Sequence, residues 1–174
     1  GLFSVGDSFN ASKIAGDLTE TNARVISSVE ETTKYKFIPE KDLFDVEYWS
    51  LEQAKIKKAK KDLQGNVVVI TGSFGAIGSA TYKLFKSYGA EVVLLDYNLQ
   101  KVNEMKSKIK DLCLHCDVTN KDSVKRAFKI ISETYGGVDI LISNAGTAIG
   151  GSIADVDDKI LRQSFEDNFF SHQN

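Results

Sequence analysis

The chain has 174 residues, of which 22 are basic and 24 acidic, for a formal net charge of −2. This balance excludes the broad positive field that attracts nucleic acid or anionic lipid, so we expect neither partner. No window reaches the roughly 18 consecutive apolar residues that a bilayer span requires, and the first residues lack the pattern of a signal peptide. With two cysteines, Cys113 and Cys116, a disulfide framework is excluded, and a cytoplasmic protein is predicted.

Residues 1–64 are predicted to form a helical segment and a connector. Apolar residues recur at steps of three, four and seven, which places them on one helix face, and Ser8 or Asn10 is a candidate N-cap. The segment 32–46 is less periodic and contains Pro39. Residues 47–55 are typical of a linker that ends in a short helix, with Ser50 as its N-cap. The residues of the apolar face are Ile14, Leu18, Val25, Ile26 and Val29.

From Asn66 onward, apolar strands alternate with helices. The run Val67–Ile70 is wholly β-branched, which is typical of a strand buried on both faces. Strands separated by helices form βαβ units with a parallel sheet between helix layers. We therefore predict an α/β chain whose residues 65–174 form the N-terminal half of a Rossmann-type sheet. The strands are expected at 67–70, 91–95, 112–116 and 138–142, and the helices at 76–88, 99–109, 121–135 and 157–170.

A glycine-rich turn, Thr71–Gly78, joins the first of these strands to its helix. Glycine permits a tight turn and lets a phosphate approach the backbone, while the helix N-terminus offers free N–H groups and a positive dipole end. Because the turn follows an apolar strand and opens a helix, a dinucleotide site is favoured over a tight turn without a ligand. The predicted phosphate-binding residues are Gly72, Phe74, Gly75, Ile77 and Gly78.

Asp96 ends the second predicted strand, near the spacing from the glycine turn at which a ribose-binding acid is expected. A carboxylate here accepts hydrogen bonds from the ribose hydroxyls and repels a 2′-phosphate, which favours NAD over NADP. The alternative is an ordinary polar residue at a strand end. We predict NAD as the cofactor.

Four motifs in this order resemble the short-chain dehydrogenase/reductase family. Thr71, Gly72 and Gly78 match its phosphate turn, although Ala76 stands where the middle glycine is usual. The other three motifs are Asp117-Val118 after the third strand, Asn144-Ala145-Gly146 after the fourth, and Asn168 in the last helix.

The resemblance implies a role for each of these later motifs. Asp117, with Val118 beside it, would meet the adenine amino group. Asn144, Ala145 and Gly146 would line the cofactor and brace the sheet. Asn168 would be the asparagine of the catalytic tetrad.

The first 64 residues resemble the junction in bifunctional rhamnulose-phosphate aldolase/short-chain dehydrogenases, through Gly1-Leu2-Phe3 and the run 40–55. This implies the tail of a metal-dependent aldolase region, whose metal ligands lie outside the chain, followed by a dehydrogenase that acts on lactaldehyde in deoxy-sugar degradation. The alternatives are a non-catalytic nucleotide-binding module, or a sugar-alcohol dehydrogenase without an aldolase partner.

The family's catalytic Ser and Tyr-x-x-x-Lys would follow a fifth strand, beyond Asn174, so we expect the chain alone to lack dehydrogenase turnover. Two stretches fit the Tyr-x-x-x-Lys spacing, Tyr82 to Lys86 and Tyr97 to Lys101. The first lies on the helix after the glycine turn and the second lies just beyond Asp96, so both are predicted to be surface or packing residues.

Cys113 and Cys116 lie in one predicted strand, and their spacing directs them to opposite faces. We therefore predict buried thiols and no metal site. The apolar strand at 138–142 would form a sheet edge, and this edge or the last helix is predicted to mediate a homo-oligomer.

Overall fold

The computed structural model describes residues 2–48, 61–152 and 154–174. The chain divides into two compact units, Gly1–Lys61 and Asp62–Asn174, and each is described by itself. Among the described residues, no helix combines the length and the apolar character that a membrane crossing requires.

The first unit contains helices α1 (Phe9–Glu30) and α2 (Glu40–Glu47). Of the two N-caps considered for α1, Ser8 is the one observed, since its hydroxyl accepts a hydrogen bond from the Ala11 N–H. The apolar face is present but lies largely open in the described structure, with Leu18 66% exposed.

Helix α2 is not predicted by the sequence pattern. Pro39 directly precedes it, and acidic residues occupy its first turn, where they oppose the positive end of the helix dipole. With eight residues, α2 is too short to show a repeating apolar pattern. Glu47 belongs to this helix rather than to a linker, and the predicted short helix with its Ser50 cap lies outside the described residues.

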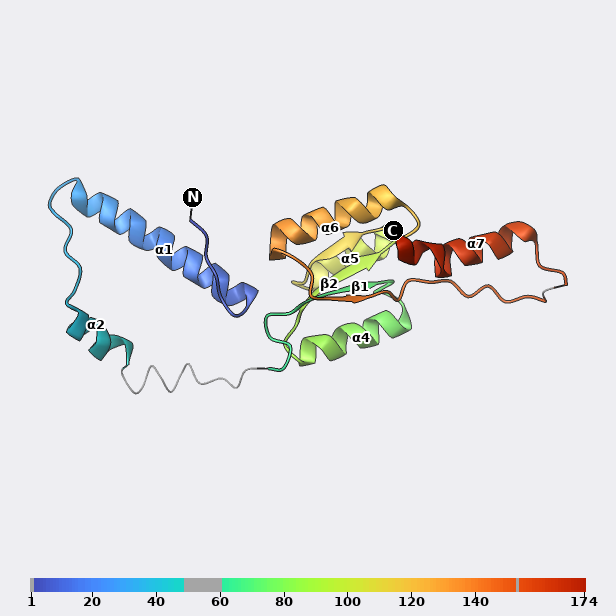
Figure 1. The fold of residues 1–174 in the computed structure, drawn as a ribbon, viewed down its shortest axis with the longest axis horizontal. Helices are drawn as coiled ribbons and strands as arrows, with labels where there is room; N and C mark the ends of the chain where they lie inside the picture. Colours follow the sequence, from blue (N-terminus) through green and yellow to red (C-terminus); the bar gives the residue numbers. More distant parts are fainter. Residues whose placement is uncertain (1, 49–60, 153) are drawn as a thin grey trace. The chain divides into compact units, whose positions relative to one another are not determined.

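The second unit is a parallel four-stranded sheet with the order β3-β2-β1-β4 (Figure 1). Its strands are β1 (Val67–Thr71), β2 (Glu91–Asp96), β3 (Cys113–His115) and β4 (Ile140–Ile142). Its helices are α4 (Ala76–Ser87), α5 (Leu99–Lys108), α6 (Lys121–Tyr135) and α7 (Asp158–Asn168), and a 3₁₀ helix, η1, spans Phe170–Gln173. The predicted Rossmann-type arrangement is confirmed.

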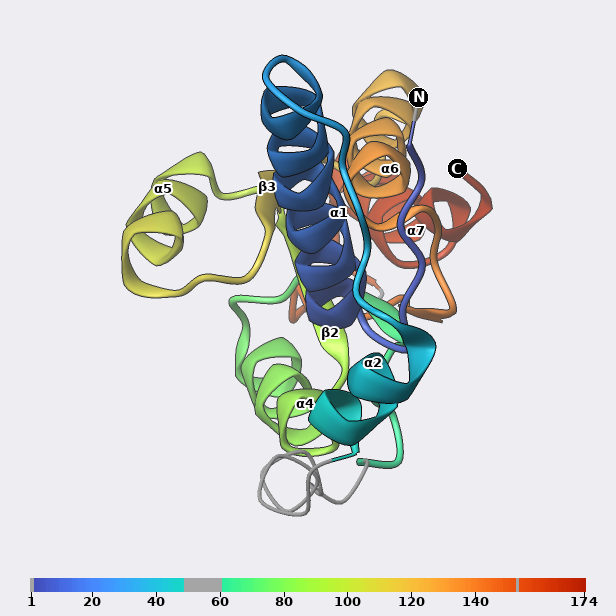
Figure 2. The same cartoon turned by 90° about the vertical axis from the view of Figure 1, so that its left-hand side faces the viewer.

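Alternate residues of the strands form two cores, one on each face of the sheet. Val68 and Ile70 pack with Tyr82 and Phe85 of α4 and with Val102 of α5. On the opposite face the core includes Val67 and Val69 of β1 together with Ala127 and Ile131 of α6. Figures 1 and 2 show α6 on one side of the sheet and α4 on the other. All five residues of β1 are buried, as a strand covered on both faces requires.

Helix ends follow the local chemistry of the caps. Gly89 and Gly136 have φ of 89° and 86°, the left-handed conformation that ends helices. Asn98 and Asn120, which the sequence analysis does not single out, cap α5 and α6 by accepting hydrogen bonds from Lys101 N and Ser123 N. The last predicted helix, 157–170, ends earlier, at Asn168, and continues as η1.

Because the strands are parallel and in register, their carboxyl ends meet at one edge of the sheet. Thr71 pairs with Leu95, and Asp96 pairs with His115. Ile142 of β4 pairs with Ile70, next to the same end of β1. The glycine turn, the acid after β2 and the loops after β3 and β4 therefore share this edge, which is where open α/β sheets bind ligands.

Candidate functional site

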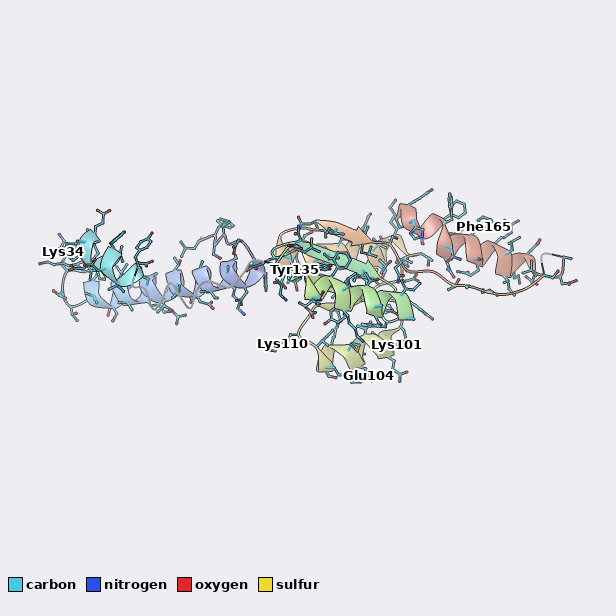
Figure 3. The ribbon with its side chains drawn as sticks, turned by 90° about the horizontal axis from the view of Figure 1, so that it is seen from below. Lys34, Lys101, Glu104, Lys110, Tyr135 and Phe165 are labelled. Atoms are coloured by element: carbon cyan, nitrogen blue, oxygen red, sulfur yellow. The ribbon has the colours of Figure 1, made fainter. Side chains whose placement is uncertain are left out.

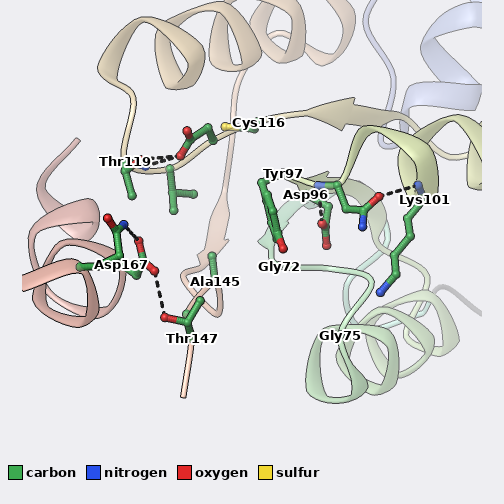
Figure 4. Close-up of a pocket in the computed structure, with 15 residues that line it drawn as sticks. Gly72, Gly75, Asp96, Tyr97, Lys101, Cys116, Thr119, Ala145, Thr147 and Asp167 are labelled. Atoms are coloured by element: carbon green, nitrogen blue, oxygen red, sulfur yellow. Dashed lines mark hydrogen bonds between the residues drawn. The ribbon is translucent and has the colours of Figure 1, made fainter. Parts of the chain in front are cut away.

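The loops at this edge surround a cavity of about 470 Å³. Figure 4 shows its walls, with α5 and the glycine turn on one side and α7 on the other. Seven residues predicted to bind cofactor line it, from the loops that follow β1, β2, β3 and β4. They are Gly72, Gly75, Asp96, Asp117, Val118, Ala145 and Gly146.

Gly72 lies at the point where the glycine turn meets the loop after β4. Its φ is 61°, and a Cβ built on it would lie 2.9 Å from Ala145 Cα. Gly75 has ordinary φ and ψ, and a Cβ there would meet only Gly72 O, at 3.4 Å. Glycine is therefore required at position 72, because a side chain there would collide with the loop after β4. At position 75 glycine leaves the cavity open, and no close contact requires it.

Gly78 does not line the cavity. It lies in the first turn of α4, where a Cβ would lie 2.4 Å from Gly72 O and 2.7 Å from Ser73 Cα. Its role is close packing of the helix on the turn. Two further predicted residues also lie outside the cavity lining: Phe74 contributes its backbone N–H to the bond with Asp96, and the Ile77 side chain is 72% exposed on α4.

Asp96 is buried, with 7% of its surface exposed, and lines the cavity. Its Oδ2 accepts a hydrogen bond from Phe74 N and its Oδ1 accepts one from Asn98 N, each at 3.0 Å. The carboxylate therefore joins the glycine turn to the start of α5. Each oxygen keeps a further lone pair, so the group can also accept hydrogen bonds from a ligand.

Thr71 and Asn144 connect the ends of β1 and β4. The Thr71 hydroxyl oxygen accepts hydrogen bonds from Asn144 N at 3.0 Å and Ala145 N at 2.9 Å. In return, Asn144 Nδ2 donates to Thr71 O at 3.0 Å and to Gly72 O at 3.1 Å. Asn144 thus braces the sheet, while the next two residues, Ala145 and Gly146, reach the cavity.

Asp117 closes its own loop through an Asx-type turn. Its Oδ1 accepts hydrogen bonds from Thr119 N at 2.9 Å and from the Thr119 hydroxyl at 2.7 Å. The loop is held to α6 as well, because Asp117 N donates to the Ser123 hydroxyl. This arrangement holds Asp117 and Val118 at the cavity.

Asn168 does not line the cavity, and its amide is committed to the backbone of Thr147. Its Oδ1 accepts from Thr147 N at 2.9 Å and its Nδ2 donates to Thr147 O at 2.8 Å. A Cβ on Gly146 would lie 2.5 Å from Asn168 Oδ1, so glycine permits this approach. Asn168 therefore acts on the loop after β4 as a positioning residue.

Several lining residues were not predicted. Tyr97 and Thr147 directly follow predicted motifs, which is a usable signal. Cys116, Thr119 and Asp167 are likewise next to predicted residues, whereas Asn98, Lys101 and Gln163 reach the cavity through the tertiary fold. The Asp167 carboxylate accepts hydrogen bonds from Thr147 Oγ1 and Gln163 Nε2 (Figure 4). The unpredicted lining residues are Tyr97, Asn98, Lys101, Cys116, Thr119, Thr147, Gln163 and Asp167.

The pair Tyr82 and Lys86 lies away from the cavity. Both side chains bind Asp111, which precedes β3, with the Tyr82 hydroxyl and Lys86 Nζ each at 2.7 Å from a carboxylate oxygen. Burial, followed by the hydrogen bond to Asp111, raises the pKa of Tyr82. A raised pKa opposes phenolate formation, so this pair stabilises the packing of α4 and is unsuited to proton abstraction.

We expect Tyr82 to make the native state sensitive to alkali. Since its folded pKa lies above the ordinary phenol value of 10.0, its contribution is complete below that pH and is lost as the pH rises further. Urea unfolding across this range should show a smaller loss of stability for Tyr82→Phe than for the unmodified chain. Tyr88→Phe, at the C-cap of the same helix, is the control, because it removes a tyrosine hydroxyl and leaves the bond between Tyr82 and Asp111 in place.

The two cysteines are free and lie in different cores, Cys113 with α4 and α5 and Cys116 with α6. This confirms the predicted opposite orientation. Burial raises the pKa of Cys113 to about 11 and that of Cys116 above its usual value.

Because the thiolate is the reactive form, we expect iodoacetamide to label neither cysteine in the native chain at mildly alkaline pH. Both should react in urea, as mass spectrometry would show. Ser107→Cys, on the exposed side of α5, is the accessible control. Rapid native labelling of Cys113 or Cys116 would contradict the burial described.

Comparison with known families gives two matches. Residues 66–174 match the short chain dehydrogenase family, and residues 1–56 match the second domain of class II aldolases. The first match covers more than half of the chain. The chain therefore belongs to the short-chain dehydrogenase family.

Individual relatives agree with this assignment. An uncharacterized oxidoreductase of Bacillus subtilis, YuxG, is 31% identical over 157 residues, covering 85% of this chain and 23% of that protein. Secoisolariciresinol dehydrogenase of Forsythia intermedia is 42% identical over 87 residues, covering 48% of this chain and 31% of that protein. A crystal structure of a short chain dehydrogenase from Mycobacterium smegmatis superposes with a TM-score of 0.60 at 27% identity, covering 64% of this chain and 48% of that one. The chain spans less than half the length of each relative.

Proposed function

We propose that residues 65–174 form the NAD-binding half of an oxidoreductase that acts on a small alcohol or aldehyde. One observation carries the proposal. The loops after all four strands of the described sheet converge on a single cavity of about 470 Å³. This volume lies within the roughly 300–1,000 Å³ of typical ligand pockets.

The residues present fit a dinucleotide. Helices α5, α6 and α7 each begin with a side chain that accepts a backbone N–H, whereas α4, which begins beside the cavity, has no side-chain cap. Its first-turn N–H groups and its dipole suit a pyrophosphate. Asp96 suits the ribose hydroxyls, and Asp117 with Val118 suits the adenine.

NAD, when bound, supplies the hydride acceptor. The chain's own residues bind and orient it: the glycine turn receives the phosphates, and Thr71 with Asn144 holds the turn against β4. Asn168 fixes the backbone of Thr147, which lines the cavity. The family's Ser and Tyr-x-x-x-Lys are part of the proposed whole enzyme, so we expect binding without turnover from these 174 residues.

Calorimetric titration of the chain with NAD and NADP tests the proposal. We expect NAD to bind more tightly, because Asp96 repels a 2′-phosphate. Gly75→Val should weaken NAD binding at least tenfold, since its side chain would enter the cavity, with only the modest loss of thermal stability expected from valine at the N-cap of α4. Gly137→Val is the matched control, because a Cβ there meets nothing within 4 Å. Failure of both nucleotides to bind would contradict the proposal, and preference for NADP would overturn the role of Asp96.

The proposal extends to the rest of the gene product. The class II aldolase match over residues 1–56, and a relative whose similarity spans 85% of this chain, support a fusion of the two regions. We propose residues 1–64 as the tail of a rhamnulose-phosphate aldolase region and residues 65–174 as a lactaldehyde-type dehydrogenase in rhamnose degradation. A cytoplasmic location is part of this proposal and is supported by the two free thiols. Lactaldehyde oxidation by the whole protein is the direct test.

We also propose that the chain self-associates. Helix α7 exposes Phe165, which is 55% accessible and projects outward from the helix (Figure 3), and β4 forms an edge of the described sheet with Leu141 52% exposed. Exposed apolar side chains and an open strand edge both favour pairing with another chain. Light scattering should show dimers or larger species, which Phe165→Glu should reduce, and a monomer at high concentration would contradict the proposal.

A further inference from the structure

Thr147 is the point at which the loop after β4 is attached to α7. Asn168 bonds to both polar groups of its backbone, at 2.9 and 2.8 Å. The preceding residue, Asp167, accepts a hydrogen bond from the Thr147 hydroxyl at 2.9 Å (Figure 4). Beyond this point the loop packs loosely, since a Cβ on Gly150 or Gly151 would meet nothing within 4 Å. Two adjacent side chains of α7 therefore hold one residue of the loop, through its backbone and through its side chain.

The part of this loop that faces the cavity lies between two attachments. At its start, Ala145 N donates a hydrogen bond to the Thr71 hydroxyl at 2.9 Å. At its end, α7 holds Thr147, and Gly146 lies between the two. Ala145 and Gly146 both line the cavity. Because consecutive Cα atoms are a fixed distance apart, a displacement of Thr147 displaces Gly146 as well, and with it the wall of the cavity.

The Asp167 carboxylate is half-buried in the last turn of α7 and is itself held in one orientation. Its Oδ1 accepts a hydrogen bond from Gln163 Nε2 at 2.7 Å, and its Oδ2 accepts the one from Thr147. The last turn is the negative end of the helix dipole, so a carboxylate there does not stabilise α7. Its contribution is instead a charge-assisted bond to Thr147, which is roughly twice as strong as a neutral one.

We propose that Asp167 is a positioning residue for the dinucleotide. Through the Thr147 hydroxyl it fixes the loop after β4, so that Ala145 and Gly146 keep the position that NAD requires. This inference rests on the proposed nucleotide-binding function and adds a residue to it. Because Asp167 acts through Thr147 and not by contact with the nucleotide, its effect on affinity depends on the Thr147 hydroxyl and disappears where that hydroxyl is absent.

Calorimetric titration with NAD in a double-mutant cycle tests this role. Thr147→Val and Asp167→Leu each keep the approximate shape of the side chain and remove one partner of the bond. We expect each to weaken NAD binding about tenfold, the effect of one lost hydrogen bond to a charged group. The double variant should bind no more weakly than either single variant, because the bond can be lost only once. Thr147→Ser keeps the hydroxyl and should bind NAD as the unmodified chain does.

Two substitutions outside the cavity lining are matched controls. Glu166→Gln changes the acid next to Asp167, and Thr134→Val removes an exposed hydroxyl that bonds within α6. Neither should change the affinity for NAD. Amide hydrogen exchange of residues 145–149 in the nucleotide-free chain gives a second measurement. A loop released from α7 should exchange faster, so exchange should rise in Thr147→Val and Asp167→Leu and stay unchanged in both controls.

The outcomes separate this inference from the function on which it rests. If the unmodified chain binds no NAD, the proposed function fails and this inference fails with it. If NAD binds but the two single losses add in the double variant, Asp167 acts independently of Thr147 and only this inference is overturned. Equal losses in Thr147→Ser and Thr147→Val would also overturn it, and so would lost affinity without faster exchange, which would indicate direct contact with the nucleotide. Should Asp167→Leu fail to fold in a thermal melt, the comparison of Thr147→Ser with Thr147→Val, at an exposed position, decides alone.

Discussion

Gly78→Ala is expected to destabilise the second unit by about 3 kcal/mol, the upper end of the usual penalty for overpacking, and to abolish nucleotide binding. The added methyl group would lie 2.4 Å from Gly72 O and 2.7 Å from Ser73 Cα. Both are backbone atoms of the glycine turn, so no flexible side chain can move aside. Helix α4 would have to shift away from the turn, which displaces the N–H groups proposed to hold the phosphates.

Thermal unfolding monitored by circular dichroism, with NAD titration on the same samples, checks this expectation. A loss of about 3 kcal/mol corresponds to a fall of roughly 10 °C in Tm for a unit of this size. Gly137→Ala is the control, because a Cβ there meets no atom within 4 Å. An unchanged Tm for Gly78→Ala would mean that α4 and the turn do not pack as described.

Asn144→Asp is the second substitution expected to have a large effect, although it changes little in size. Asn144 Nδ2 donates to two carbonyl oxygens, Thr71 O and Gly72 O. A carboxylate oxygen in its place would face both carbonyls, with repulsion replacing two hydrogen bonds. We expect a loss of at least about 2 kcal/mol, the penalty for leaving polar groups unsatisfied plus the repulsion, together with a large loss of NAD affinity.

Asn120→Asp is the matched control, because the same chemical change is expected to leave the stability unchanged at that position. Asn120 accepts a hydrogen bond from Ser123 N at the start of α6, and a carboxylate accepts it equally well and complements the helix dipole. Urea unfolding should show Asn120→Asp as stable as the unmodified chain. If Asn144→Asp behaved in the same way, Asn144 would have no bracing role.

Asn144 also illustrates which features of the site could be predicted from the sequence. The Asn144-Ala145-Gly146 resemblance implied both cofactor contact and bracing, and the structure divides these roles, with Asn144 bonded to the end of β1 and Ala145 and Gly146 at the cavity. Likewise, the glycine pattern predicted the turn, but only the packing distances separate Gly75 from Gly78. A motif identifies which residues meet, whereas the neighbours of each Cβ depend on the folded backbone.

The parallel sheet, the order of its elements and the helices on both faces were all predictable from the sequence. Local rules govern them: β-branched runs such as Val67–Ile70 are buried, and glycine at Gly89 and Gly136 ends helices. Helix α2 was not predictable in this way, because eight residues give no periodic signal and Pro39 and the acidic first turn carry the information instead.

Only the tertiary structure showed which residues outside the predicted motifs share the cavity. Asp167 and Lys101 lie 66 positions apart in the sequence and reach one site only because the carboxyl ends of parallel strands bring their following segments together. The same holds for the commitment of Asn168 to the Thr147 backbone, across 21 positions. Periodicity and propensity act over a few residues, so they specify elements, while contacts between elements depend on how the whole sheet assembles.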